Sequence, residues 1–162
     1  MKGDRKIIEH LNEALTVELT AINQYFVQAR TLKAWGYAKL AGKMYQESIG
    51  EMKHAEALID RVLFLEGVPN ITRYNQVHLG ADVKAMLQND LKLETSGVTL
   101  YNGAIEACSH AKDAGSREIL EHILVNSEEH VDWLETQMDL IEGVGIENYL
   151  AQQMGGGEGA KG

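Results

Sequence analysis

The chain has 162 residues and a net charge of −9, with 44% hydrophobic and 24% charged residues. This composition is typical of a soluble globular protein with one domain. The negative charge argues against a nucleic-acid partner and favours the binding of cations. The sequence contains no signal peptide and no apolar stretch long enough to span a membrane, so we expect a cytoplasmic protein without a membrane partner.

Apolar residues recur every three or four positions in four long segments, a spacing typical of amphipathic helices. Asp4 is a suitable cap for the first helix, and Gly36 and Gly115 are expected in turns. The sequence Gly67-Val68-Pro69-Asn70 should end the second helix. The sequence therefore predicts an all-α fold with four long helices and a short fifth one, at about residues 4–33, 36–65, 81–111, 116–142 and 146–154.

The segment from Pro69 to Gly80 contains the only proline and has no helical pattern. A loop of this length is unusual inside a compact domain. It is needed if the second and third helices run parallel, because the chain must then travel the length of the bundle. We expect a four-helix bundle with a long crossover loop over residues 1–154, followed by a flexible glycine-rich tail at residues 155–162.

Polar residues interrupt the apolar faces of all four long helices, at positions where side chains should face a common core. An unpaired buried carboxylate is costly, and several together normally require a cation. In carboxylate metal sites of four-helix bundles, two helices supply one Glu each and two supply a Glu-x-x-His pair. Such a ligand set suits iron or manganese, and zinc can also bind. The candidate ligands are Glu18, the pair Glu51 and His54, Glu94, and His130.

The second Glu-x-x-His pair is incomplete, because Ser127 stands three positions before His130. Glu128 follows the serine, but one residue turns about 100° around a helix, so Glu128 could replace the missing carboxylate only through a local bulge. A neutral hydroxyl is a poor bridge between two cations. The site therefore has three Glu and two His where six ligands are expected. Near it, Tyr25 and Trp133 could donate electrons or simply pack.

Several long segments resemble bacterioferritin, the haem-bearing member of the ferritin family, and the resemblance covers almost the full chain. They are residues 1–4, 19–26, 47–55, 61–70 and 128–135. The resemblance implies a ferritin-like fold, a cage of 24 subunits assembled from dimers, and storage of ferric mineral in its cavity. It also implies a di-iron ferroxidase centre that oxidises Fe(II) with oxygen or peroxide. The family's catalytic metal ligands fall on Glu18, Glu51, His54, Glu94 and His130, and its bridging Glu falls on Ser127.

Met52 lies off the core-facing side of the second helix, on another apolar face with Tyr45, Ile49, Ile59 and Leu63. Such a face predicts a subunit interface, and ordinary packing explains a methionine there. The resemblance implies instead that Met52 binds haem b at a two-fold dimer interface, with one methionine from each subunit. It further implies a haem reductase or a ferredoxin as electron donor for iron release.

The sequence leaves three functions open. The first is an iron-storage ferroxidase in which Glu51 bridges two irons and water replaces the missing bridge. The second is a haem-carrying structural subunit whose centre is impaired by Ser127 and which co-assembles with a catalytic bacterioferritin subunit. The third is an oxidase or peroxidase of the rubrerythrin type. The third is disfavoured because the only cysteine, Cys108, cannot form a rubredoxin-like iron site and should be a packed, reduced thiol.

Overall fold

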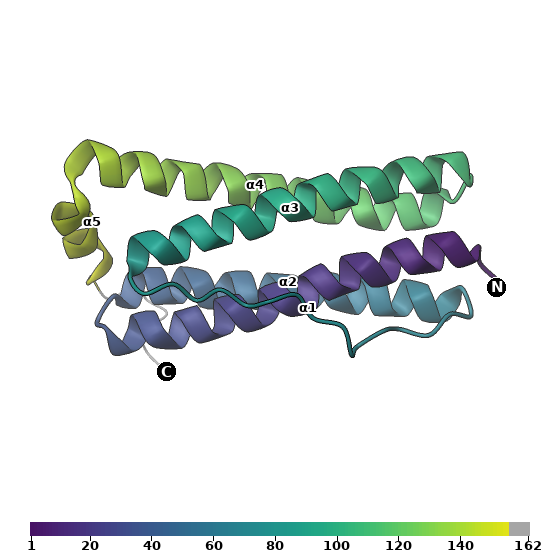
Figure 1. Cartoon of the computed structure of the whole chain (residues 1–162), viewed down its shortest axis with the longest axis horizontal. Coiled ribbons are helices and arrows are strands. Elements are labelled where there is room, and N and C mark those ends of the chain that lie inside the picture. Colours follow the sequence, from purple (N-terminus) through teal and green to yellow (C-terminus); the bar gives the residue numbers. More distant parts are fainter. Residues whose placement is uncertain (156–162) are drawn as a thin grey trace.

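The computed structural model describes residues 1–155, and its helices form a four-helix bundle with a short fifth helix across one end (Figure 1). The predicted all-α, ferritin-like architecture is confirmed, and every helix begins and ends within two residues of its predicted position. Part of the predicted tail, residues 156–162, lies outside the described residues. No helix in residues 1–155 is long and apolar enough to cross a membrane. The helices are α1 (Arg5–Ala34), α2 (Ala38–Phe64), α3 (Val83–His110), α4 (Ala114–Val144) and α5 (Ile146–Gln153).

The bundle consists of two antiparallel helix pairs, α1 with α2 and α3 with α4 (Figure 1). The connection from α2 to α3 runs the length of the bundle along α1, so that α3 starts at the opposite end from the last turn of α2. The prediction that the second and third helices run parallel is therefore confirmed. Asp4 caps α1 as predicted, since its side chain accepts a hydrogen bond from the N–H of Lys6 at 2.7 Å.

The turns after α1, α2 and α3 share one type of helix cap. Each contains a residue with positive φ, namely Gly36 (92°), Glu66 (60°) and Lys112 (58°). The N–H of the following residue then bonds back to a carbonyl of the last helical turn, as Tyr37 does to Leu32 at 2.9 Å. This is the hydrogen-bond pattern of the Schellman motif, which satisfies carbonyls that a helix end would otherwise leave unpaired.

The sequence predicts that Gly115 forms the turn before the fourth helix. This prediction is wrong, because Gly115 lies inside α4. The turn is made instead by Lys112, which adopts the left-handed conformation. A Cβ atom at Gly115 would lie 2.7 Å from Nη2 of Arg61. The glycine thus leaves room for the guanidinium, whose Nη2 donates to Oδ1 of Asp113 at 2.7 Å and whose Nε donates to Oγ of Ser116 at 2.9 Å. These bonds join the end of α2 to the start of α4.

A row of buried polar side chains on α1 fixes the crossover loop. Asn12 donates to the carbonyl of Val68 at 3.1 Å and accepts from the N–H of Asn70 at 2.8 Å. Two turns further on, Oγ1 of Thr20 accepts from the N–H of Asn75 at 2.9 Å. An irregular loop has no helix or sheet to satisfy its backbone groups, so these side chains take that role. The row has one residue at every fourth position: Asn12, Thr16, Thr20, Gln24 and Gln28.

The apolar core of the bundle is divided into two clusters by a polar middle section. One cluster surrounds Leu11, Leu58 and Cys108, and the other surrounds Leu32 and Leu87. Cys108 is completely buried, and burial raises the pKa of its thiol to about 11. The expected packed, reduced thiol therefore agrees with the structure. Between the two clusters lie the polar residues of the candidate site.

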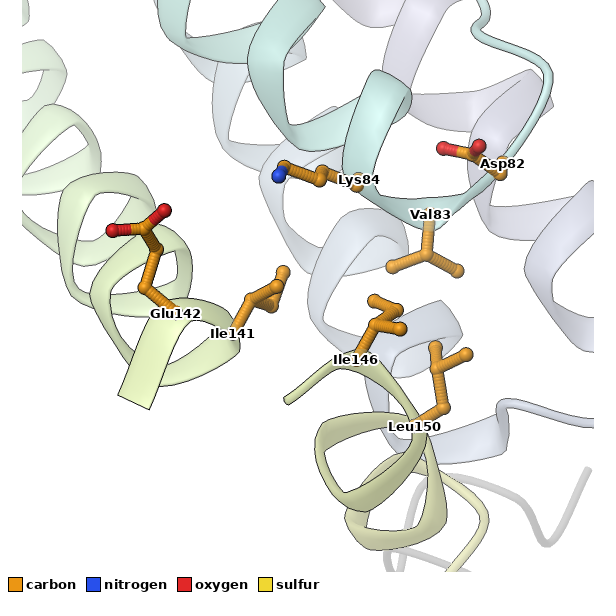
Figure 2. A pocket seen from close by; sticks show the side chains of 7 residues that line it. All are labelled: Asp82, Val83, Lys84, Ile141, Glu142, Ile146 and Leu150. Carbon is orange, nitrogen blue, oxygen red and sulfur yellow. The ribbon is translucent and has the colours of Figure 1, made fainter. Parts of the chain in front are cut away.

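Helix α5 lies across one end of the bundle, where it packs against the end of α4 and the start of α2 and faces the start of α3. Figure 2 shows the hollow between these elements, in which Ile146 and Leu150 of α5 lie beside Val83 of α3 and Ile141 of α4. The hollow is lined mainly by aliphatic side chains and contains no cluster of metal-binding or nucleophilic groups. Its position far from mid-bundle separates it from the candidate site.

Candidate metal centre

The structure brings all five predicted ligands into the middle section of the bundle. Glu18 of α1 is 1% exposed, and Glu94 of α3 and His130 of α4 are each 4% exposed. Glu51 of α2 is also buried, while His54 is partly buried. The polar residues that interrupt the apolar faces of the four helices therefore lie together in the fold, between the two apolar clusters.

Glu18, Glu51 and His54 form the first group of potential ligands. Nδ1 of His54 lies 2.8 Å from Oε2 of Glu51 and 3.4 Å from Oε2 of Glu18. One ligand atom from each of the three residues lies within 4.8 Å of the other two. Because Glu51 and His54 are three residues apart on one helix, their side chains share a face and converge as the sequence predicts.

His130 lies in a second group, which includes a residue that the sequence did not single out. Its Nδ1 is 2.9 Å from Oε1 of Glu94 and 3.5 Å from Oε2 of Glu47. Ligand atoms of Glu47, Glu51 and His130 lie within 4.8 Å of one another. Glu51 is common to both groups and stands between them. The signal for Glu47 was its position one helical turn before Glu51, which places both on one face of α2.

Ser127 is buried on the core side of α4, and no neighbour on that helix supplies a carboxylate in its place. The serine is 3% exposed. Helix α4 continues through this region without a bulge, and Glu128 and Glu129 are exposed. As expected for a helix without a bulge, Glu128 does not take the place of the missing carboxylate.

Two buried tyrosines hold carboxylates of the site. The hydroxyl of Tyr25 donates to Oε1 of Glu94, and that of Tyr101 donates to Oε1 of Glu18. Burial and the nearby carboxylates raise the pKa of both phenols well above 10, so both remain protonated donors. Tyr25 thus packs and also orients a candidate ligand. The ring of Trp133 lies 5.9 Å from the ring of His130, measured between centroids.

The charge balance of the site favours a bound cation. Burial raises the pKa of Glu18 to about 7, and burial together with the charge of Glu18 raises the pKa of Glu51 well above 4.5. Burial is the largest single influence on His130 and opposes its charged form, but the hydrogen bond to Glu94 and the negative charges of Glu94, Glu47 and Glu51 together raise the imidazole pKa. Oε2 of Glu18 is buried and accepts no hydrogen bond from the described residues. A metal ion would supply the positive charge and the partner that these groups lack.

Asp90 is a further buried carboxyl that the sequence did not reveal. It lies one turn before Glu94 on α3 and is completely buried. Its Oδ1 accepts from Nε2 of Gln24 at 2.8 Å, while Oδ2 has no partner among the described residues. Burial raises the pKa of Asp90 to about 7. Gln24 also accepts from the N–H of His78 at 3.2 Å, so Gln24 links the crossover loop to α3, the helix that carries Asp90 and Glu94.

Met52 lies apart from the other predicted residues, on the outer side of α2. Its side chain is 51% exposed, and the nearby Tyr45 and Leu63 are also exposed. Ile49 and Ile59 are partly buried. The predicted second apolar face is therefore present on the surface of the subunit, as expected for a helix face that meets another molecule.

The chain is a four-helix bundle with a candidate carboxylate–histidine metal site, and residues 8–144 match the family described as the ferritin-like domain. The chain is 44% identical over 149 residues to the bacterioferritin of Brucella melitensis, covering 92% of both chains. It is 45% identical to the bacterioferritin of Streptomyces coelicolor, over 93% of this chain and 90% of the relative. It is 40% identical to bacterioferritin BfrA of Mycobacterium tuberculosis, over 94% of this chain and 96% of the relative. The chain belongs to the bacterioferritin family.

Proposed function

We propose that this protein stores iron in a cage of 24 subunits built from dimers, and that each bundle oxidises Fe(II) to Fe(III). The observation that carries the proposal is the convergence of Glu18, Glu51, His54, Glu94 and His130 from four helices, with Glu51 common to both groups of ligands. Membership of the bacterioferritin family supports the same function. The negative net charge of −9 suits a protein that collects cations.

In this proposal the two groups of side chains bind two ions. Glu18 and His54 hold one Fe(II), Glu94 and His130 hold the other, and Glu51 lies between them. Each Fe(II) loses one electron. The pair reduces one O₂ and two protons to H₂O₂, or one H₂O₂ and two protons to two water molecules. The hydroxyls of Tyr25 and Tyr101 keep two carboxylates in place during this change of charge.

The proposal includes haem b at a two-fold interface, where Met52 of each subunit would hold it. Its support in this chain is the half-exposed thioether on an apolar surface that also carries Tyr45 and Leu63. When bound, the haem supplies electrons, received from a reductase or ferredoxin, that reduce stored iron for release. Met52→Leu should abolish the haem absorbance of the purified protein, while Met44→Leu, a change of a fully buried methionine, should not.

A second candidate function is favoured by Ser127. In this version the chain is a haem-carrying structural subunit with an impaired centre, and a second bacterioferritin subunit in the same cage performs the oxidation. A serine hydroxyl cannot neutralise a second cation as a carboxylate does, so the second ion would bind weakly. The two versions differ in what the homopolymer alone can do.

Aerobic Fe(II) titration of the purified homopolymer distinguishes the two functions. For a competent ferroxidase we expect a rapid oxidation phase that saturates near two irons per subunit. Ser127→Glu should then change this phase little, and Ser127→Gln serves as the control of equal size without charge. If the rapid phase is present only in Ser127→Glu, the native chain is the structural subunit and its catalytic partner must be sought in the native cage.

A further inference from the structure

We propose that Glu47 of α2 replaces the carboxylate missing at Ser127, as a ligand of the ion held by Glu94 and His130. The inference rests on the proposed metal centre and concerns which residue completes it. With Glu47, the site regains four carboxylates and two imidazoles, the ligand number that the Glu-x-x-His architecture requires. The sixth ligand then comes from α2 instead of α4.

The position of Glu47 relative to His130 is the first argument. Oε2 of Glu47 lies 3.5 Å from Nδ1 of His130, and ligand atoms of Glu47, Glu51 and His130 lie within 4.8 Å of one another. The Glu47 side chain is 21% exposed, so it stands at the edge of the buried site. Its position one turn before Glu51 brings both carboxylates to the same side of α2.

Lys43 provides the second argument, because it fixes the direction of the Glu47 carboxylate. Nζ of Lys43 lies 2.8 Å from Oε1 of Glu47. It also lies 4.8 Å from the ring centroid of Trp133 on α4, a cation–π contact that holds the ammonium beside the site. One carboxylate oxygen is therefore engaged at the rim, and the other faces His130. Lys43 is a positioning residue for this ligand.

The third argument concerns a buried ligand atom that lacks a partner. Oε2 of Glu18, which lies 3.4 Å from Nδ1 of His54, has no hydrogen-bond partner among the described residues. The group of carboxylates and imidazoles that Glu47 joins is therefore not satisfied by hydrogen bonds within residues 1–155. On α4 the replacement cannot come from Glu128, which is exposed on a regular helix. Glu47 is the carboxylate outside the predicted set that reaches His130.

This arrangement gives the two ions unequal surroundings. A Glu at position 127 would bridge both ions, whereas Glu47 groups with Glu51 and His130 but not with Glu18 and His54. It therefore serves as a terminal ligand of one ion. Glu51 remains the single bridging carboxylate, and the ion beside Glu18 has only three protein ligands. We expect two binding steps of different affinity.

Anaerobic Co(II) titration of the intact assembled protein tests the assignment without any oxidation. Binding is followed by the visible absorption of protein-bound Co(II) and by calorimetry, for the native protein and for Glu47→Gln, Ser127→Glu and the double variant. Glu128→Gln is the matched control, since it removes an exposed carboxylate next to Ser127. Signal that persists in Glu51→Gln is subtracted as binding outside the centre.

The native protein should bind two Co(II) per subunit. In Glu47→Gln the affinity of one of the two steps should fall at least about tenfold, because even loss of an outer-sphere partner typically costs about 10–100-fold. In the Glu47→Gln background, Ser127→Glu should restore the affinity of the weakened step. The effects of the two substitutions on Co(II) affinity should therefore be strongly non-additive. Glu128→Gln should behave like the native protein, and circular dichroism should show equal helix content throughout.

Three results would overturn the assignment in different ways. Equal binding of two ions by the native protein and Glu47→Gln would show that Glu47 is not a ligand, while the metal centre itself stands. Binding of a single ion by the native protein, with two in Ser127→Glu, would show that Glu47 does not compensate for the serine. If no Co(II) bound above the Glu51→Gln background, the proposed metal centre would fail together with this inference.

Discussion

The buried carboxyl of Glu18 should make the metal-free protein less stable as the pH rises. Burial raises its pKa from 4.5 to about 7 in the folded protein. The folded state therefore keeps a proton that the unfolded chain has lost, so the stabilisation is complete below pH 4.5 and disappears as the pH rises through 7. At about 1.36 kcal/mol per pKa unit, Glu18 should lower the free energy of unfolding by about 2.5 kcal/mol between pH 5 and pH 8. This corresponds to a shift in Tm of about 5–10 °C for a chain of this size.

Thermal unfolding of the native protein and of Glu18→Gln, measured by circular dichroism in a chelating buffer from pH 5 to pH 8, tests this reasoning. The glutamine keeps an acceptor for the hydroxyl of Tyr101 but cannot ionise. Other groups titrate alike in both proteins, so the Tm difference between them should change by the stated amount across this range. A difference that stays constant with pH would refute the argument. After removal of the chelator, Zn(II) at pH 8 should raise the Tm of the native protein more than that of the variant.

Three further outcomes are expected. Thr20→Val removes the oxygen that accepts a hydrogen bond from the Asn75 N–H at 2.9 Å. It should therefore lower the free energy of unfolding by about 1–3 kcal/mol and speed proteolysis in residues 65–82. Thr99→Val, a change of an exposed threonine, should alter neither quantity. Gly80→Ala should cost at least about 2 kcal/mol in thermal unfolding, because Gly80 has a φ of +87° and a Cβ there would lie 2.6 Å from a backbone nitrogen of α3. Cys108, completely buried with a pKa of about 11, should resist a thiol reagent at pH 8 until the protein is denatured; rapid reaction of the folded protein would contradict its burial.

The helices and their order were predictable because burial of one helix face imposes a regular apolar spacing. The parallel course of α2 and α3 followed from the length of the loop between them. The attachment of that loop was not predictable. Asn12, Thr20 and Gln24 have the polarity of a solvated helix face, yet all three are buried. Only the folded chain shows that the backbone of the crossover covers them, since this contact joins residues more than fifty positions apart.

The candidate site was predictable where a polar residue stands within an apolar stripe, as Glu18, Glu51 and His130 do. Glu47 and Asp90 escaped prediction for a common reason. Each lies one turn before a predicted ligand and on the same side of its helix, but at the edge of the apolar stripe, where an acidic residue is usually solvated. Their environment depends on the neighbouring helices: Glu47 faces His130 of α4, and Asp90 is buried against Gln24 of α1. The sequence of one helix does not contain that information.

The loop and the metal centre are parts of one hydrogen-bonded arrangement. Gln24 accepts from the backbone of the crossover and donates to Asp90, which lies one turn from Glu94 on α3. Tyr25, the next residue on α1, donates to Glu94 itself. Helix α1 is therefore tied to the loop on one side and to a ligand-bearing helix on the other, by bonds that need no metal. A site held in this way keeps its carboxylates close together before any metal ion arrives, and their mutual repulsion and burial are compensated when protons or a metal ion bind. The free-energy cost of burying these carboxylates in the metal-free site is therefore relieved when a metal ion binds, which favours binding.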